Sequence, residues 1–322
     1  MQVNELFRQS NTILLDGGMG TMLQAAGLKL GARPEELNIT DPALIEGIHG
    51  QYAAAGSRIV NANTFGASAH KLAGSAYTLE QVITAGIENC KRACAPYGAL
   101  TALDVGPLGE LLEPSGTLAF EDAVAEYARI VKAGEAAGAD LIFFETYTDL
   151  YELKAALLAA KENTHLPILA SMSFEAGGRT FTGCTVESFA ATARGLGANA
   201  VGINCSLGPK EIFPMAKRLA EAVPGDFPVF VKPNAGLPNL DGSYDITPAE
   251  FAAEMAAYLP TGISMLGGCC GSEPESIRLL KELTQDKTPA AKTPIVRSRL
   301  CTPVRCVEVN GITVVGERIN PT

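Results

Sequence analysis

Apolar and polar residues follow one repeating pattern along most of the chain. A short run rich in Val, Ile and Leu ends in Gly, Asn, Asp or Cys, and a stretch with apolar residues three or four positions apart follows. The first pattern is typical of a buried strand and the second of an amphipathic helix. The predicted strands are Thr12–Leu15, Arg58–Asn61, Leu100–Leu103, Leu141–Phe144, Ile168–Met172, Ala200–Ile203, Val229–Val231 and Ile263–Leu266.

Eight helices are predicted between and after these strands. Eight such strand–helix units favour an α/β fold of the closed (β/α)₈ TIM barrel type, which typically takes about 250 residues. An open, doubly wound sheet is the alternative, but Asp16-Gly17-Gly18-Met19-Gly20 lacks the G-x-G-x-x-G spacing of a dinucleotide site. Ser272 is the expected N-cap of the last helix. The predicted helices are Leu44–Ala55, Leu79–Cys94, Phe120–Ala137, Leu150–Lys161, Val186–Arg194, Lys210–Ala222, Pro248–Tyr258 and about Pro274–Leu283.

The pattern changes after the last predicted helix, so we expect residues 1–285 to form the barrel and residues 286–322 a separate segment. Gln285–Pro303 is rich in Lys, Thr, Pro and Ala and lacks a core period, which is typical of a linker. Cys306–Val309 and Ile312–Val315 are predicted as two short strands around Asn310-Gly311, a favoured hairpin turn.

Composition narrows the class of protein. The 322 residues are 47% hydrophobic and 19% charged, which excludes disorder as the dominant state. Acidic residues outnumber basic ones 35 to 25, and a net charge of −10 without a basic stripe argues against nucleic-acid binding. No apolar run approaches the roughly 18 residues of a membrane span, and no secretory signal begins the chain. We therefore expect a soluble, cytoplasmic protein that binds neither nucleic acid nor membranes.

Candidate chemistry lies at the carboxyl ends of the predicted strands, where a TIM barrel places its active site. Asp16-Gly17-Gly18 follows the first strand and Glu145 the fourth. Cys205 follows the sixth strand, Asn234 lies after the seventh, and Cys269-Cys270 lies after the eighth. These side chains are expected to meet over the mouth of the barrel.

Three of the eight cysteines are therefore candidates for one metal site. Without a secretory signal the cysteines are expected to be reduced thiols. Cys205, Cys269 and Cys270 can reach one ion if the flanking glycines let the backbone bend sharply. Three thiolates and an open fourth position are typical of a catalytic zinc. Cys184 is the substitute ligand, and the alternative is that all these cysteines are small core residues.

A zinc ion with three thiolate ligands would keep a bound thiol ionised at neutral pH, which suits alkylation of a small thiol better than hydrolysis. Asp16 and Glu145 are suited to hold the ammonium group of such a substrate, and the amides of Gly17 and Gly18 its carboxylate. Asn234 could cap the metal or the substrate. Three alternatives stay open: Asp16 as a helix N-cap, Glu145 as the structural partner of a lysine, and Asn234 as a turn residue.

The same segments resemble the homocysteine S-methyltransferase family over about residues 5–285. Within it, the chain looks most similar to the homocysteine-binding module of the cobalamin-dependent methionine synthases. The resemblance implies a TIM barrel, a zinc ion held by Cys205, Cys269 and Cys270, and a homocysteine amino group held by Asp16 and Glu145. The matching motifs are DGGMGT (Asp16–Thr21), NTFG (Asn63–Gly66), FET (Phe144–Thr146), GINCSLGP (Gly202–Pro209), KPNAG (Lys232–Gly236) and GGCCG (Gly267–Gly271).

The end of the chain, VVGERINPT (Val314–Thr322), resembles the opening of the pterin-binding, methyltetrahydrofolate domain of those enzymes. We therefore expect residues 286–322 to hold a linker, a hairpin and the truncated start of that domain, in a fragment of a longer enzyme. The implied reaction is attack of homocysteine, bound to zinc as a thiolate, on the methyl group of methylcobalamin, giving methionine. Other modules, with which this one would interact, bind cobalamin and regenerate its methyl group from 5-methyltetrahydrofolate. No residue is expected to act as a general acid or base.

Three other functions are compatible with the sequence. The first is a stand-alone methyltransferase that uses betaine or S-methylmethionine as the methyl donor. The second is a non-catalytic barrel scaffold stapled by zinc, in which the metal has four protein ligands and ignores thiols. The third is a thiol-redox protein that uses Cys269-Cys270, which is disfavoured because adjacent cysteines form a disulfide only with strain.

Overall fold

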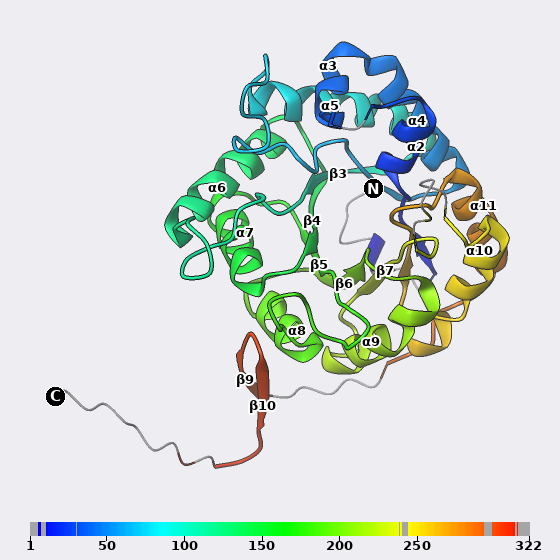
Figure 1. Ribbon diagram of the computed structural model, residues 1–322. Helices are drawn as coiled ribbons and strands as arrows, with labels where there is room; N and C mark the ends of the chain where they lie inside the picture. Colours follow the sequence, from blue (N-terminus) through cyan, green and yellow to red (C-terminus); the bar gives the residue numbers. More distant parts are fainter. Residues whose placement is uncertain are drawn as a thin grey trace.

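The computed structural model describes residues 6–7, 11–29, 31–237, 239, 244–292, 298–312 and 314. Its centre is an eight-stranded parallel sheet in the order β1-β8-β7-β6-β5-β4-β3-β2. A parallel bridge between Leu15 and Ile59 joins the two outer strands, so the predicted (β/α)₈ barrel is confirmed (Figure 1). The strands are β1 (Ile13–Leu14), β2 (Ile59–Asn61), β3 (Leu100–Val105), β4 (Leu141–Tyr147), β5 (Ile168–Met172), β6 (Ala200–Asn204), β7 (Val229–Lys232) and β8 (Met265–Leu266).

Helices surround the barrel, and all eight predicted helices are present (Figure 1). Two short ones were not predicted: α2 (Met19–Ala25) and α3 (Leu37–Thr40), both in the connection after β1. None of the helices in the described part of the chain is long and apolar enough to cross a membrane. The others are α4 (Pro42–Ala55), α5 (Leu79–Cys94), α6 (Phe120–Ala136), α7 (Leu150–Asn163), α8 (Val186–Gly195), α9 (Pro209–Ala222), α10 (Pro248–Ala256) and α11 (Pro274–Thr284).

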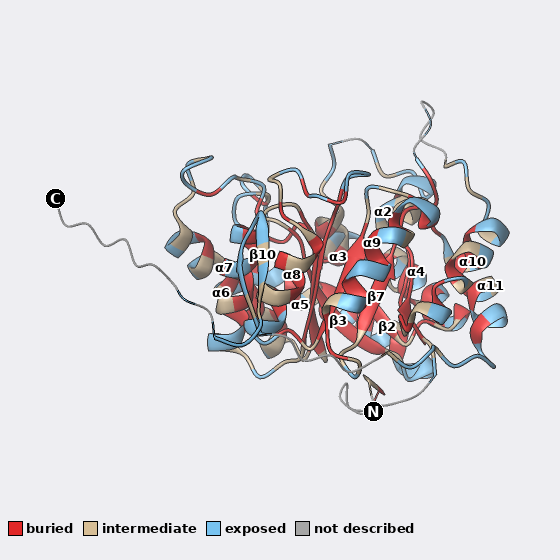
Figure 2. Ribbon diagram, turned by 90° about the horizontal axis from the view of Figure 1, so that it is seen from below, coloured by how far each residue is buried: buried red, intermediate tan, exposed pale blue. Residues whose placement is uncertain are grey.

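The core has two layers, one between the helices and the sheet and one inside the barrel (Figure 2). Helix α5 illustrates the outer layer: a Thr78–Gln81 capping box begins it, and its buried face includes Cys90 and Cys94. These two cysteines are therefore core residues. The inner layer is a cluster that includes Ile59, Ala102, Phe143, Leu169, Ala200, Phe230 and Met265.

The barrel interior changes from apolar to polar toward the carboxyl ends of the strands. Side chains two positions apart along a strand point to the same face. The residues two positions beyond Ile59, Ala102, Phe143 and Phe230 therefore continue the same interior rows, and all of them are polar. They are Asn61, Asp104, Glu145 and Lys232, each less than 10% exposed.

The hairpin after the barrel lies one strand earlier than predicted. Strands β9 (Ser298–Thr302) and β10 (Arg305–Val309) pair around Pro303-Val304, so part of the predicted linker is a strand. Ile312 and Val314 lie in no strand, while Thr313, Val315 and the rest of the predicted stub are outside the described residues. Tertiary contacts outweigh the Asn310-Gly311 turn signal, because Cys301 Sγ in β9 lies 3.4 Å from Thr192 Oγ1 in α8.

Candidate functional site

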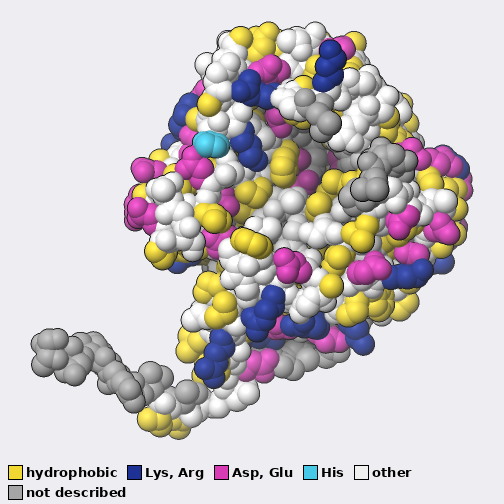
Figure 3. Space-filling view, viewed as in Figure 1, with side chains coloured by type: hydrophobic (Ala, Val, Ile, Leu, Met, Phe, Trp, Pro, Cys, Tyr) yellow, Lys and Arg dark blue, Asp and Glu magenta, His cyan; other side chains and the backbone are white. Residues whose placement is uncertain are grey.

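A cavity of about 320 Å³ opens at the carboxyl end of the barrel, where the surface is hollowed in Figure 3. It brings together seven of the eight residues singled out from the sequence: Asp16, Gly17, Gly18, Glu145, Cys205, Cys269 and Cys270. Asn234, the eighth, is buried but is not among the residues that line the cavity. The predicted convergence of strand ends is therefore confirmed.

The three predicted thiols form one cluster in which all Sγ atoms lie within 4.8 Å of one another. Cys205 follows β6 directly, and its φ of 61° is in the left-handed region that non-glycine residues rarely adopt. Its amide donates to the Lys232 carbonyl at 3.0 Å, which holds the strained turn to the neighbouring strand. Such strain is concentrated at functional sites, where the surrounding structure compensates for it.

Cys269 and Cys270 reach the same cluster because backbone contacts bend the turn after β8. The Cys269 amide donates to the Pro233 carbonyl at 2.8 Å, and the Cys270 carbonyl accepts from Ala235 at 2.9 Å. Gly271 then adopts a φ of 79°, which a side chain would disfavour.

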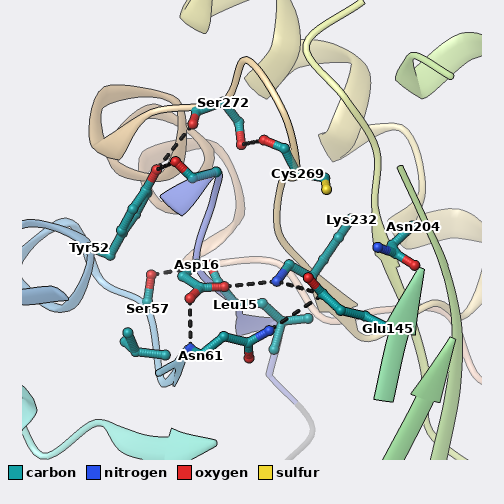
Figure 4. Close-up of polar contacts among 12 residues, drawn as sticks. Leu15, Asp16, Tyr52, Ser57, Asn61, Glu145, Asn204, Lys232, Cys269 and Ser272 are labelled. Carbon is teal, nitrogen blue, oxygen red and sulfur yellow. Dashed lines mark hydrogen bonds and ion pairs between the residues drawn. The ribbon is translucent and has the colours of Figure 1, made fainter. Parts of the chain in front are cut away.

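Ser272 does not cap the following helix, contrary to the prediction. Glu273 caps α11 through a box with Ser276, and the Ser272 hydroxyl donates to the Cys269 carbonyl at 2.6 Å instead. Figure 4 shows this contact beside the Tyr52 hydroxyl, which donates to the Ser272 carbonyl at 3.1 Å. Ser272 is therefore used to position the turn that carries the thiols.

The donor set suits a zinc ion. Zinc–sulfur bonds of about 2.3 Å place tetrahedral ligand sulfurs about 3.8 Å apart, which the observed cluster accommodates. Hydrogen bonds from the thiols of Cys205 and Cys269 lower the pKa of Cys270 to about 3, so one thiolate is already favoured. Within the described residues, the buried Oδ1 atom of Asn234 has no hydrogen-bond partner, which leaves it available to a bound ion or ligand.

Cys184, the substitute ligand, is not part of the cluster. It is buried in the loop before α8, and its thiol donates to the Thr185 carbonyl at 3.4 Å. Burial raises its pKa to about 12. Cys184 is thus a core thiol and is not needed as a substitute for Cys205, Cys269 or Cys270 in the cluster.

A buried lysine lies between the two predicted carboxylates (Figure 4). Lys232 Nζ is 2.9 Å from Asp16 Oδ1 and 3.2 Å from Glu145 Oε2. It also lies 5.0 Å from the centre of the Phe143 ring, which adds a cation–π contact. The alternative that Glu145 pairs with a lysine is therefore confirmed, and Asp16 shares the same partner.

Asp16 is a partner of this lysine rather than a helix cap. Its second oxygen, Oδ2, accepts the Asn61 amide at 2.7 Å, and helix α2 begins after Gly18 with no side-chain cap. The amide of Gly18 donates to the Ser272 carbonyl at 3.1 Å. Gly18 is therefore not free to bind a substrate carboxylate through this amide in the observed arrangement.

Glu145 is positioned by an irregularity in β4. The β4–β5 register shifts between Phe144 and Tyr147, and Thr146 has a φ of 67°. Asn204 at the end of β6 holds this bulge by accepting from the Thr146 amide at 2.9 Å and donating to its hydroxyl at 2.7 Å. Bulges of this kind re-aim side chains beside active sites, and here the bulge places Glu145 on the cavity wall.

The electrostatics of this group follow from burial and proximity. Burial raises the pKa of Asp16 and of Glu145, and the charge of Lys232 opposes that rise. Burial alone would lower the pKa of Lys232, but the charges of Asp16 and Glu145 raise it well above its usual value. With these three groups ionised, two negative charges face one positive charge.

The cavity wall also holds residues that were not singled out from the sequence, among them Lys232, Asn61, Asp104 and Glu35. Lys232 stands in the KPNAG segment at the end of the seventh predicted strand, but its carboxylate partners Asp16 and Glu145 are distant in the chain. Side chains two positions apart on a strand share a face, so extending the apolar inner rows by two positions would have identified Asn61, Asp104 and Lys232. Glu35 lies in a 3₁₀ turn and accepts the Gly66 amide at 2.7 Å, a contact that no local pattern indicates.

Comparison with known proteins identifies the family of this site. The homocysteine S-methyltransferase family model matches residues 13–284. A curated methionine synthase of Mycobacterium tuberculosis is 31% identical over an alignment of 333 positions, which covers 95% of this chain and 27% of that protein. The chain therefore spans about a quarter of the length of this relative.

Solved structures of the homocysteine methyltransferase MmuM from Escherichia coli are similar. The oxidised form superposes with a TM-score of 0.73 and 25% identity, covering 86% of this chain and 97% of that one. The metallated form gives the same TM-score at 24% identity, over 87% and 98% of the two chains. The chain thus combines a TIM barrel, three clustered thiols and a match to the family model over most of its length. The chain belongs to the homocysteine S-methyltransferase family.

Proposed function

We propose that this chain is the homocysteine-binding, zinc-containing unit of a cobalamin-dependent methionine synthase. The observation that carries the proposal is the cluster of Cys205, Cys269 and Cys270 on the wall of a cavity that also holds buried carboxylates. The similarity to a methionine synthase at 31% identity supports this branch of the family.

Cys205, Cys269 and Cys270 would hold the zinc. Asn234, whose Oδ1 has no hydrogen-bond partner within the described residues, would cap the metal or the substrate. Bound there, zinc supplies a charge that keeps a substrate thiol ionised at neutral pH. The residues of the chain bind and orient the rest of the amino acid. The cavity of about 320 Å³ has room for one such molecule.

Asp16, Glu145 and Lys232 give the cavity its selectivity for an amino acid. Their charges sum to minus one when all three are ionised, so an incoming ammonium group neutralises the cluster. Gly17 would present its amide to the carboxylate, whereas the Gly18 amide is already engaged by the Ser272 carbonyl. No general base is required at the sulfur, because metal binding displaces the thiol proton.

The methyl group would come from methylcobalamin carried by another module and regenerated from 5-methyltetrahydrofolate by a third. Residues 286–322 would connect the barrel to the pterin-binding domain, with the boundary near residue 285. We propose a cytoplasmic location for the whole enzyme. These assignments rest on the resemblance of the sequence motifs and on the similarity to the longer relative.

Two other functions follow from the same site and make different predictions. A stand-alone enzyme would take the methyl group from betaine or S-methylmethionine. This alternative is supported by the similarity to MmuM, which is named a homocysteine methyltransferase. A non-catalytic scaffold would use the same cysteines with a fourth protein ligand.

A donor assay separates the enzymes. The zinc-loaded chain is incubated with homocysteine and, in turn, methylcobalamin, betaine and S-methylmethionine, and methionine is measured. We expect methionine from methylcobalamin alone; turnover with betaine and none with methylcobalamin would overturn the proposal. X-ray absorption at the zinc edge tests the scaffold, because homocysteine adds a sulfur ligand only in the enzyme.

A further inference from the structure

The hairpin after the barrel carries two cysteines that lie outside the thiol cluster. Cys301 in β9 and Cys306 in β10 are direct partners in the register of the two strands. Directly paired residues of antiparallel strands point to the same face, so the two side chains are neighbours. Both are free thiols, and Cys301 is exposed while Cys306 is half-buried. The hairpin therefore presents a pair of thiols away from the cavity.

The position of this pair in the hairpin suits a disulfide. The loop is Pro303-Val304, so Thr302 and Arg305 close it and exchange backbone hydrogen bonds. Hydrogen-bonded and non-hydrogen-bonded pairs alternate along an antiparallel ladder, which makes Cys301 and Cys306 a non-hydrogen-bonded pair. The Cα atoms of such a pair are about 4.5 Å apart, within the range of about 4.4–6.8 Å that disulfides span.

The reduced thiol of Cys301 is turned toward α8, beside which the hairpin stands (Figure 1). Its Sγ lies 3.4 Å from Thr192 Oγ1 and 3.9 Å from the Ser188 carbonyl oxygen. A thiol is a weak donor and a weak acceptor, so turning the side chain of Cys301 toward Cys306 gives up little free energy. The contacts of the reduced thiol therefore leave it available for a bond to its cross-strand partner.

Solvent access distinguishes this pair from another pair of neighbouring thiols outside the cluster. Cys90 Sγ lies 3.8 Å from Cys94 Sγ, but both residues are buried in the core. Thiol–disulfide exchange needs a thiol that a reagent can reach. Cys301 meets this requirement, whereas Cys90 and Cys94 do not while the barrel is folded.

A covalent link between the strands would matter to the hairpin, because two strands alone are marginally stable in water. The barrel holds this hairpin through separate polar contacts. The Thr185 amide donates to the Pro303 carbonyl at 3.1 Å, and Arg299 Nη1 donates to the Ala222 carbonyl at 2.5 Å. A disulfide would keep the two strands in register independently of these contacts.

We propose that Cys301 and Cys306 are a site of reversible oxidation, at which a small-molecule disulfide converts the two thiols into a cross-strand disulfide. Cys301, the more exposed thiol, attacks one sulfur of the small disulfide as a thiolate and breaks its S–S bond, and the released small thiolate takes up the proton that Cys301 lost. Cys306 then attacks Cys301 Sγ as a thiolate and displaces the second small thiolate, which takes up the proton of Cys306. Two protein thiols are oxidised and one small disulfide is reduced to two thiols. The site uses none of the cavity residues and is independent of the proposed function.

Peptide mapping tests the proposal, because trypsin cleaves after Arg299 and Arg305 and so separates the two cysteines. The zinc-loaded chain is incubated with oxidised glutathione, remaining thiols are alkylated, and the unreduced digest is analysed by mass spectrometry. We expect Leu300–Arg305 linked to Cys306–Arg318, about tenfold more abundant than glutathione adducts of either peptide, since the second attack is intramolecular. Dithiothreitol should return both peptides to the free thiol form.

Two controls separate this reaction from general oxidation. Cys306→Ser removes the second nucleophile, so Cys301 should accumulate as its glutathione adduct. Cys90 and Cys94 serve as the control within the same digest, and they should stay reduced because they are buried. Free Cys301 and Cys306 after the incubation, or stable adducts without the linked pair, would overturn the proposal. Equal oxidation of Cys90 and Cys94 would also overturn it, since the reaction would then not select accessible cross-strand partners.

Discussion

Replacing Lys232 by Met removes the one cation from a buried group of charges. Its ammonium lies 2.9 Å from Asp16 and 3.2 Å from Glu145, and the three side chains are 3%, 5% and 10% exposed. Breaking a buried ion pair costs about 3–5 kcal/mol, because the remaining charges lose their compensation. We therefore expect Lys232→Met to lower the free energy of unfolding by about 3–5 kcal/mol at pH 8.

The loss should depend on pH in a defined direction. Burial already raises the pKa of Asp16 and Glu145, and Lys232 opposes that rise, so the substitution raises both further. A carboxyl whose folded-state pKa exceeds its unfolded value favours folding while protonated, and this contribution disappears as the pH rises through the folded-state pKa. The pKa of Lys232 is itself raised well above 10.5, so its own contribution is complete at pH 8. The difference between the two proteins should be smallest near pH 5 and largest at pH 8.

Urea unfolding followed by circular dichroism measures this difference, with a chelator present so that metal release does not contribute. Lys210→Met is the matched control, because Lys210 lies 2.7 Å from Glu254 but is 76% exposed, and exposed pairs contribute little. It should leave the unfolding free energy unchanged. Adding Glu145→Gln to Lys232→Met should recover part of the loss, since one uncompensated charge is removed. A loss below about 1 kcal/mol at pH 8, or an equal loss at both pH values, would refute the reasoning.

Three further substitutions test other parts of the structure. Cys205→Ser removes one of three clustered thiols and should abolish stoichiometric zinc binding, measured by atomic absorption after gel filtration; one retained equivalent contradicts the site. Ser206→Gly relieves an exposed residue with a φ of 64° and should stabilise the chain by about 0.5–1 kcal/mol in urea unfolding, whereas a loss would show that the turn is not strained. Gly202→Ala places a methyl group 2.2 Å from a Phe230 ring carbon and should cost about 1–3 kcal/mol. Gly177→Ala, with nothing within 4 Å of the added atom, is its control, and equal effects of the two would contradict the packing argument.

The strands and long helices were predictable because burial alone produces their patterns. Each barrel strand is buried on both faces and reads as an apolar run, as in Leu141–Phe144. The short helix α2 was missed because it has one buried residue, Leu23, and no side-chain cap. The hairpin was predicted in the wrong place because Asn310-Gly311 is a strong local turn signal, whereas the contact between β9 and α8 cannot be seen in the local sequence.

The metal ligands were predictable for a different reason. Cys205 follows β6 directly and Cys269-Cys270 lie within a few residues after β8, so the topology of a barrel is enough to bring them together. The barrel topology also places Lys232, the last residue of β7, at the cavity, but it does not indicate that its ammonium group pairs with Asp16, 216 residues away. The engagement of the Gly18 amide by Ser272 is likewise a product of tertiary packing.

The pairing of β1 with β8 has a consequence for how the protein is made. Ile13 pairs with Met265, near opposite ends of the barrel sequence. At about 5–20 residues per second, the ribosome takes about 13–50 s to add the residues between them. During that time the edge of β1 that faces β8 has no partner, although β2 is already present on its other side.

Cys269 and Cys270 follow β8 within a few residues, so they leave the ribosome at the end of this interval. The thiol cluster can therefore form only after β8 has been synthesised. Metal binding by all three cysteines is thus confined to a late stage in the synthesis of the barrel.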